Sequence, residues 1–254
     1  MKYLIQIRLL IFALVIPISN YSQNINGFAP GEEIEFIIKY GPIVGGRAIA
    51  TLENARINNQ EVYHAKMVAR SAGLADLLYR VEDIYESYFS PETGLPYMAI
   101  RNISEGDYRF YNETEFFHKD NYVLSQKSGK IDVPEGILDM VTALYKIRRL
   151  NYSNYKDGDI INITTYFDDE IFPFDIRYKG IETIKTSLGN VECIKFVPFV
   201  EPGRIFESED DMTIWVSNDK NLLPIRVKFD LLVGSIKCDL VNYSNLKYPS
   251  NILD

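Results

Sequence analysis

Histidine is the side chain most often used for acid–base chemistry near neutral pH. The sequence contains two, His64 in VYHAK and His118 in FFHKD. A hydrolytic site of the serine or cysteine type needs such a histidine within reach of a nucleophile and an acid. The chain has no G-x-S-x-G elbow and no S-x-x-K accompanied by its downstream partner motifs. We therefore expect ordinary strand and turn histidines, and we assign no catalytic residue.

A second candidate for chemistry is the stretch IWVSNDKNLLPIRVK, which contains Ser217 and Asp219 two residues apart. No histidine lies near this pair in the sequence. Residues 218–221 are of the types that hydrogen-bond their own backbone in turns. Pro224 stands near the start of the next strand, where proline is tolerated. The stretch is therefore predicted to be a strand, a corner and a returning strand.

Acidic runs at Asp168–Glu170, and at Glu207 with Glu209–Asp211, are candidate cation ligands. Calcium loops need carboxylates at alternate positions and a glycine for the sharp turn, and neither run has that pattern. The chain also lacks H-E-x-x-H, C-x-x-C and a glycine-rich phosphate loop. We predict solvated loops at both runs, and no metal or cofactor.

The two cysteines, Cys193 in VECIKF and Cys238 in SIKCDL, lie in segments that have the pattern of strands. A disulfide between them is chemically possible if the protein is exported to an oxidising compartment. Two buried thiols on different strands are the alternative, and the sequence leaves both open. A structural zinc site would need four ligands, so these residues are not predicted to bind zinc.

The first 22 residues have the pattern of a secretory signal peptide. Lys2 and Arg8 form a basic start, and Leu9–Ile18 is an apolar run too short to span a bilayer. Cleavage before Gln23 would leave a domain of residues 23–254. The whole chain has a net charge of −8, so loss of two positive charges leaves −10. This acidic balance argues against nucleic acid and anionic lipid surfaces as partners.

Alternation with period two dominates the remaining sequence. Ile34, Phe36, Ile38 and Tyr40 share one face of a strand, and the next segment places Ala48, Ala50 and Leu52 together, where something must pack closely. Strands recur every 8–12 residues or so, which predicts a mainly β protein with a single antiparallel, strongly curved sheet or open barrel. A sandwich is the alternative.

Two segments have helical patterns. Residues 133–149 are predicted to form the main helix, with Asp132 as its N-cap and its apolar face packed on the concave side of the sheet. The segment AGLADLLYR is predicted to form a short helix, with Ser71 as a candidate cap.

Several segments together resemble the DUF3108 family of exported bacterial proteins. They are FAPGEEIEFIIKYGPIVGGRA, YHAKMVARS, YESYFSPETGLPYMAIRNISEG, VPEGILDMVTALYKIRR and MTIWVSNDKNLLPIRV with VGSIKCDL. The resemblance covers nearly all of residues 23–254 and transfers no catalytic or ligand residue. It implies one mainly β domain outside the cytoplasm, in the periplasm or alternatively the extracellular space. By fold analogy alone, the expected shape is similar to periplasmic lipoprotein carriers of the LolA/LolB type.

Aromatic residues make up 13% of the chain, and a curved sheet with surplus apolar surface can enclose a lipophilic ligand. Our leading hypothesis is a non-enzymatic envelope protein, not integral to the membrane, that binds a lipophilic or extended ligand at the concave side. It predicts an apolar cavity. The alternatives are an assembly factor that offers a sheet edge to another envelope protein, and a hydrolase with an unrecognised site.

Overall fold

The computed structural model describes residues 26–199, 208 and 210–252. The predicted signal peptide, residues 1–22, lies outside the described residues, as do Glu207 and Glu209 of the second acidic run. In the part that is described, strands dominate and two helices are present.

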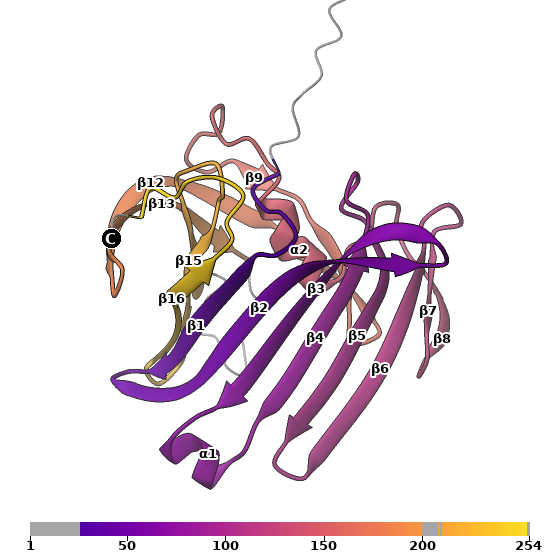
Figure 1. Cartoon of the computed structure of the whole chain (residues 1–254), viewed down its shortest axis with the longest axis horizontal. Helices are drawn as coiled ribbons and strands as arrows, with labels where there is room; N and C mark the ends of the chain where they lie inside the picture. The colour runs from indigo at the N-terminus through magenta and orange to yellow at the C-terminus, as the bar shows by residue number, and fades with distance from the viewer. Residues whose placement is uncertain (1–25, 200–207, 209, 253–254) are drawn as a thin grey trace, which may run out of the picture.

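The strands form one large antiparallel sheet of fourteen strands that is not closed into a barrel, in the order β8-β7-β6-β5-β4-β3-β2-β1-β16-β15-β14-β13-β12-β9. The sheet curls so that its two arms face each other (Figure 1). This confirms the predicted curved antiparallel sheet. Its strands are β1 (Glu33–Tyr40), β2 (Ile43–Ile57), β3 (Gln60–Ser71), β4 (Glu82–Phe89), β5 (Pro96–Glu105), β6 (Tyr108–Phe117), β7 (Tyr122–Ser125), β8 (Gly129–Asp132), β9 (Ile160–Ile161), β12 (Ile176–Thr186), β13 (Gly189–Pro198), β14 (Met212–Ser217), β15 (Pro224–Asp230) and β16 (Ser235–Ser244).

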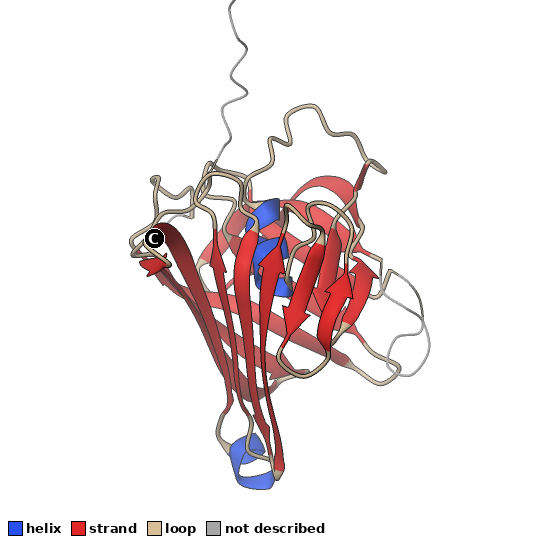
Figure 2. Ribbon diagram, turned by 90° about the vertical axis from the view of Figure 1, so that its right-hand side faces the viewer, coloured by secondary structure: helices blue, strands red, loops and turns tan. Residues whose placement is uncertain are grey.

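A separate hairpin of β10 (Thr164–Phe167) and β11 (Glu170–Pro173) accompanies the large sheet. Helix α2 (Met140–Ile147) lies between the two arms of the sheet, near the end of the sheet where the described residues begin (Figures 1 and 2). The register pairs Ile34 with Ala50 and Phe36 with Ala48, so these four side chains share the concave face. The small alanines therefore lie opposite the helix, as their pattern predicts.

Helix α2 is shorter than predicted and starts later. Asp132 is the last residue of β8, and Asp139 is the N-cap. The carboxylate of Asp139 accepts hydrogen bonds from the backbone N–H groups of Val141 (2.7 Å) and Thr142 (3.0 Å). It also accepts one from the Ser87 hydroxyl on β4 (2.7 Å). A local capping pattern exists at both aspartates, but only Asp139 is reached by a donor from the sheet.

Residues 133–139, between β8 and α2, are not helical and contact the β10–β11 hairpin. Gly136 has a φ of 72°, a left-handed conformation that interrupts helical geometry. Leu138 then forms a parallel bridge with Thr165 of β10. The segment therefore anchors the β10–β11 hairpin beside the sheet before the helix begins.

Helix α1 (Leu74–Leu78) confirms the predicted short helix between β3 and β4. Its N-cap is Gly73 and not Ser71, and no side chain caps it. The Ser71 hydroxyl donates to the Asp76 carboxylate (2.6 Å) and accepts from the Val81 N–H (2.9 Å). Ser71 thus closes the whole β3–β4 connection instead of capping its helix.

The stretch from Ile214 to Lys228 forms the predicted hairpin of β14 and β15. The Ser217 hydroxyl donates to Asp219 (2.8 Å) and accepts from the Leu223 N–H (2.8 Å). Asp219 also accepts from the Asn221 N–H (2.9 Å). The polar side chains of the corner are therefore used to fold the turn.

The C-terminal end of α2 is held by the buried guanidinium of Arg148. Its two Nη atoms pair with the two carboxylate oxygens of Glu32, at 2.5 and 2.7 Å. It also donates to the carbonyls of Gly27 (2.8 Å) and Asn221 (3.2 Å). Both charged side chains are at most 3% exposed. One side chain thus joins the helix, the segment before β1 and the β14–β15 corner.

The substitution Arg148→Met is expected to lower the free energy of unfolding by about 3–5 kcal/mol, because it leaves the Glu32 carboxylate buried without a partner. Urea unfolding followed by circular dichroism measures this. The matched control is Arg47→Met, which removes a single contact to Glu35 from a half-exposed arginine and should cost under about 1 kcal/mol. Equal losses of unfolding free energy in the two variants would show that the buried pair stabilises the fold no more than the exposed pair does.

Candidate functional site

An apolar cavity of about 280 Å³ lies between the concave face of the sheet and helix α2. Its volume is close to the lower end of small-molecule sites, about 300–1,000 Å³. Strands from both arms of the sheet form the wall, and the helix forms the opposite side. The main wall residues are Ile34, Phe36, Ala48, Ala50, Met67, Ile214, Val227 and Phe229 from the sheet, and Met140, Leu144 and Ile147 from the helix segment.

Methionine is concentrated in this wall. Of the five methionines in the sequence, Met67, Met140 and Met212 line the cavity, one from each arm of the sheet and one from the helix. Methionine is unbranched and polarisable, so it adapts to apolar ligands of different shape. The wall can therefore change shape around what it encloses.

Two wall residues carry polar atoms. Arg148 reaches the cavity, but its guanidinium is engaged by Glu32 and two carbonyls. Tyr145 is buried, and this burial raises the pKa of its hydroxyl above the usual value, so it stays neutral. The cavity therefore presents apolar surface with no charge available to a ligand.

The thiol of Cys238 also lines the cavity, and burial raises its pKa to about 11. Burial raises the pKa of Cys193 to about 12. Both are free thiols. Cys193 is on β13 and Cys238 on β16, with β14 and β15 between them. Three strand spacings are roughly 14 Å, whereas the Cα atoms of a disulfide lie about 4.4–6.8 Å apart. The two cysteines therefore lie on separate strands, with Cys193 buried and Cys238 half-buried.

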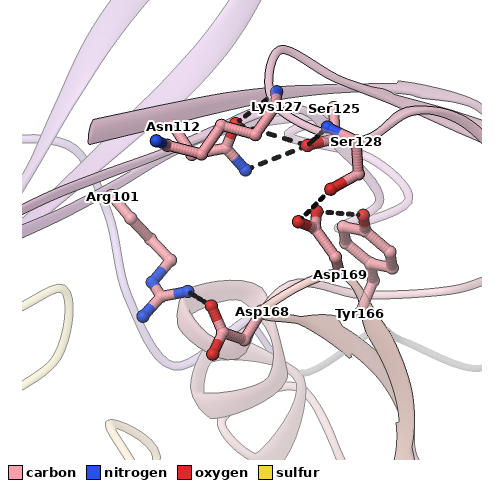
Figure 3. Close-up of polar contacts among 8 residues, drawn as sticks. All are labelled: Arg101, Asn112, Ser125, Lys127, Ser128, Tyr166, Asp168 and Asp169. Carbon is pink, nitrogen blue, oxygen red and sulfur yellow. Dashed lines mark hydrogen bonds and ion pairs between the residues drawn. The ribbon is translucent and has the colours of Figure 1, made fainter. Parts of the chain in front are cut away.

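A polar cluster ties the β10–β11 hairpin to the sheet (Figure 3). Asp168 pairs with Arg101 of β5 at 2.6 Å, and Asp169 accepts from the Tyr166 hydroxyl (2.7 Å) and from Ser128. Both aspartates have left-handed backbones, with φ of 54° and 63°. The acidic run at residues 168–170 is therefore a tight turn in which both aspartates have partners. Asp168 and Glu170 are exposed, as in a solvated loop, and Asp169 is half-buried.

The same cluster continues to the β6–β7 side of the sheet. Asn112 Nδ2 donates to the Ser125 hydroxyl at 3.1 Å, and its Oδ1 accepts from the Lys127 N–H (Figure 3). The guanidinium of Arg101 lies 4.2 Å from the ring centre of Phe167 and 4.8 Å from that of Phe110. Each of these groups fixes one strand or turn to another, so we assign the cluster to structure.

The histidines lie elsewhere. His64 Nε2 is 2.6 Å from Glu86 Oε2, and its ring stacks on Tyr88 at 4.2 Å. These side chains alternate with Ala65 and Ser87, which face the helix, so they lie on the outer face of the sheet. His118 Nε2 is 2.7 Å from the Pro96 carbonyl oxygen. His64 thus has the carboxylate that a hydrolase would need, but among the described residues its side chain bonds to Glu86 and stacks on Tyr88, and it has no hydrogen bond to a serine or cysteine.

Within the described residues, no group of three His, Cys, Asp or Glu side chains is arranged to hold a metal ion. In the same part of the chain, neither helix is long and apolar enough to cross a membrane.

The family model described as "Protein of unknown function (DUF3108)" matches residues 35–241, which include most of the sheet and all of α2. The chain belongs to the DUF3108 family. The comparison with curated proteins found no match.

Among solved structures, this DUF3108 chain is similar to a beta-barrel-like protein of the domain of unknown function DUF1849 from Brucella abortus. The two share 10% sequence identity with a TM-score of 0.55, over 84% of this chain and 96% of that chain. It is also similar to a DUF1089 family protein from Pseudomonas aeruginosa, at 12% identity and a TM-score of 0.41, over 73% and 89% of the chains. The first likeness shows a shared β-barrel-like fold.

The thiols allow a direct test of this part of the fold. Protein unfolded in guanidinium without reductant should give two titratable thiols per chain, and a single disulfide-linked species would contradict the strand order. In native Cys193→Ser protein, the thiolate fraction of Cys238 well below its pKa of about 11 should be roughly a hundredfold smaller than that of a thiol at 9. Alkylation should therefore be slow near neutral pH and should accelerate as the pH rises towards 11.

Proposed function

We propose that this protein binds a lipophilic ligand in the cavity between helix α2 and the concave face of the sheet, without catalysing a reaction on it. The observation that carries the proposal is the cavity itself, whose wall is apolar apart from an arginine already paired with Glu32 and a neutral tyrosine. The ligand that fits this chemistry has an apolar chain or ring system and no charge inside the cavity.

The apolar surface of the cavity supports this proposal. Removing apolar surface from water contributes about 25 cal/mol per Å². A ligand with an apolar chain or ring system therefore gains binding free energy from each wall residue that it covers.

We further propose that the protein acts outside the cytoplasm. The basic start and short apolar run of residues 1–22 support this location. An envelope protein that sequesters a lipophilic molecule would keep it out of water between membranes or at a membrane surface.

The other two hypotheses receive less support. In the described part of the sheet, the terminal strands β8 and β9 are four and two residues long. Beyond the two residues that pair with β9, the sequence of β12 contains Lys179, Glu182 and Lys185. Short and charged edges are those that natural sheets use to avoid pairing with other chains. For a hydrolase, the His64–Glu86 pair lies on the outer face, away from the cavity.

Filling the cavity should weaken binding. Ala48→Phe places a ring in the cavity, so it is expected to reduce binding of the apolar fluorescent probe N-phenyl-1-naphthylamine by tenfold or more, since each 1.4 kcal/mol is about tenfold in affinity. Fluorescence titration measures this.

The matched control is Ile49→Phe, which adds a ring at the adjacent position of β2 on the outer face, where Ile49 is exposed. Its affinity should equal that of the unmodified protein. Native mass spectrometry of protein purified from its own envelope then identifies the ligand. The proposal fails if the unmodified protein binds no probe, or if both phenylalanine variants bind it equally well.

A further inference from the structure

Four hairpin ends lie together at the end of the sheet opposite the N-terminal segment, and we call them the hairpin rim. They are the β1–β2 end (residues 40–46), the β3–β4 connection with α1 (residues 72–81), the β5–β6 turn (residues 105–108) and the β15–β16 turn (residues 231–234). Figure 1 shows them along the lower end of the sheet, and Figure 2 shows α1 projecting beyond it.

Hydrogen bonds join the four ends into one continuous edge. The Tyr40 hydroxyl donates to the Val233 carbonyl (2.8 Å), which links the β15–β16 and β1–β2 turns. The N–H of Ala72 donates to Gly45 O (3.0 Å), and the N–H of Gly106 donates to Arg80 O (2.8 Å). The rim is therefore a built surface and not a set of independent loops.

The rim is strongly apolar and exposed. Helix α1 has no buried residue, and Leu77 and Leu78 on it are 82% and 79% exposed. Ten of the seventeen exposed large hydrophobic residues in the described part of the chain belong to the rim: Tyr40, Ile43, Val44, Leu74, Leu77, Leu78, Tyr79, Tyr108, Leu232 and Val233. Residues 40–46 and 231–234 contain no charged side chain, whereas the other two ends contain Asp76, Arg80, Glu105 and Asp107. Contiguous exposed apolar surface of this kind marks an interaction site.

A row of three lysines crosses the outer face of the sheet just above the rim. Lys39 of β1 is paired with Lys237 of β16, which is paired with Lys228 of β15. Like charges directly opposite one another destabilise a sheet. Asp239 and Asp230 partly offset the row, at 4.0 Å from Lys39 and 2.7 Å from Lys228. The row remains a local positive band in a protein of net negative charge.

The distance between the lysine row and the apolar end of the β15–β16 turn matches the distance between lipid headgroups and buried apolar side chains at a bilayer surface. The pair Lys228–Lys237 is two residues along the strands from Asp230–Ser235, the last pair before the β15–β16 turn. Leu232 lies two residues further on, in the turn. At about 3.3 Å per residue, the lysines are on the order of 10 Å from the tip. Apolar elements at a bilayer surface are buried about 5–10 Å, with basic side chains at the level of the headgroups.

The rim is also continuous with the cavity. Ile34 and Phe36 of β1 line the cavity, and Ile38 and Tyr40 continue the same face to the rim. Ile38 is paired with Cys238, another cavity residue. An apolar track therefore runs along one strand from the rim to the proposed binding site.

We propose that the hairpin rim docks the protein onto a phospholipid bilayer, with the leucine and valine tips inserted and the lysine row against lipid phosphates. The observations favour a bilayer over a folded partner because a row of lysines lies on the order of 10 Å above the apolar edge, which matches the separation of headgroup phosphates from buried apolar side chains. Three tyrosines, Tyr40, Tyr79 and Tyr108, stand at the rim, and such amphipathic rings favour the membrane–water interface. The docking proposal depends only on the rim residues. Transfer of a ligand along the apolar track depends in addition on the proposed function.

Flotation with vesicles tests the docking. The unmodified protein is expected to float with vesicles of phosphatidylcholine containing a minority of phosphatidylglycerol. Leu77→Asp with Leu78→Asp, or Leu232→Asp with Val233→Asp, should lower the partition coefficient by on the order of tenfold or more, because burial of these side chains drives insertion. Lys39→Gln with Lys237→Gln should weaken binding, and salt should weaken binding of the unmodified protein.

The matched control is Ile181→Asp, which changes a residue of β12 that is 54% exposed but lies outside the rim. It should float as the unmodified protein does. The proposal is overturned if the unmodified protein does not float, or if the rim variants float equally well. It is also overturned if the rim variants disrupt a dimer in vesicle-free solution, since a second copy would then cover the rim. Ala48→Phe should float and yet bind the probe more weakly, which separates failure of the docking from failure of the cavity proposal.

Discussion

The buried ion pair between Arg148 and Glu32 is the contact that the rest of the structure depends on. Taking both charges out of water is costly, and it is tolerated because the guanidinium and carboxylate meet in a bidentate geometry and the remaining donors reach the Gly27 and Asn221 carbonyls. The three segments that meet there are far apart in the sequence. Because each supplies a group that would be unsatisfied without the others, the end of α2 has one position relative to the sheet.

The other end of α2 is held in the same manner, by Ser87 donating to the buried carboxylate of Asp139. Burial raises the pKa of this carboxyl, and the capping bonds oppose the shift because they favour the charged form. A helix of eight residues fixed by polar contacts at both ends cannot settle freely onto the sheet. Small residues such as Ala48 and Ala50 lie beneath it, and the space between is the cavity. The polar anchors thus explain why an apolar space exists where close packing would otherwise be expected.

Much of this fold follows from the sequence. The alternation from Ile34 to Tyr40 and the turn types of residues 218–221 predict strands and a hairpin, and the structure has both. The small residues of β2 predict close packing on the concave face, whereas the structure has the cavity between them and α2. The cavity follows only in outline, because its volume depends on where α2 is held. That position is set by Glu32 and Arg148, which are 116 residues apart and give no local signal. The start of α2 also depends on a distant residue, because Asp132 and Asp139 both have capping side chains and only Asp139 accepts a hydrogen bond from Ser87 of β4.

Net charge is also an incomplete guide to binding partners, because it averages over separate parts of the protein surface. A net charge of −8 argues against anionic partners for the chain as a whole. The lysines at positions 39, 228 and 237 are nevertheless brought into one row by the pairing of β1, β16 and β15. Beyond about one Debye length, roughly 10 Å at ordinary salt, charges elsewhere on the protein are screened from a surface that meets this row. A bilayer in contact with the rim would therefore experience the lysines, the apolar side chains and the few charged residues of the rim itself, and acidic side chains farther away would contribute little.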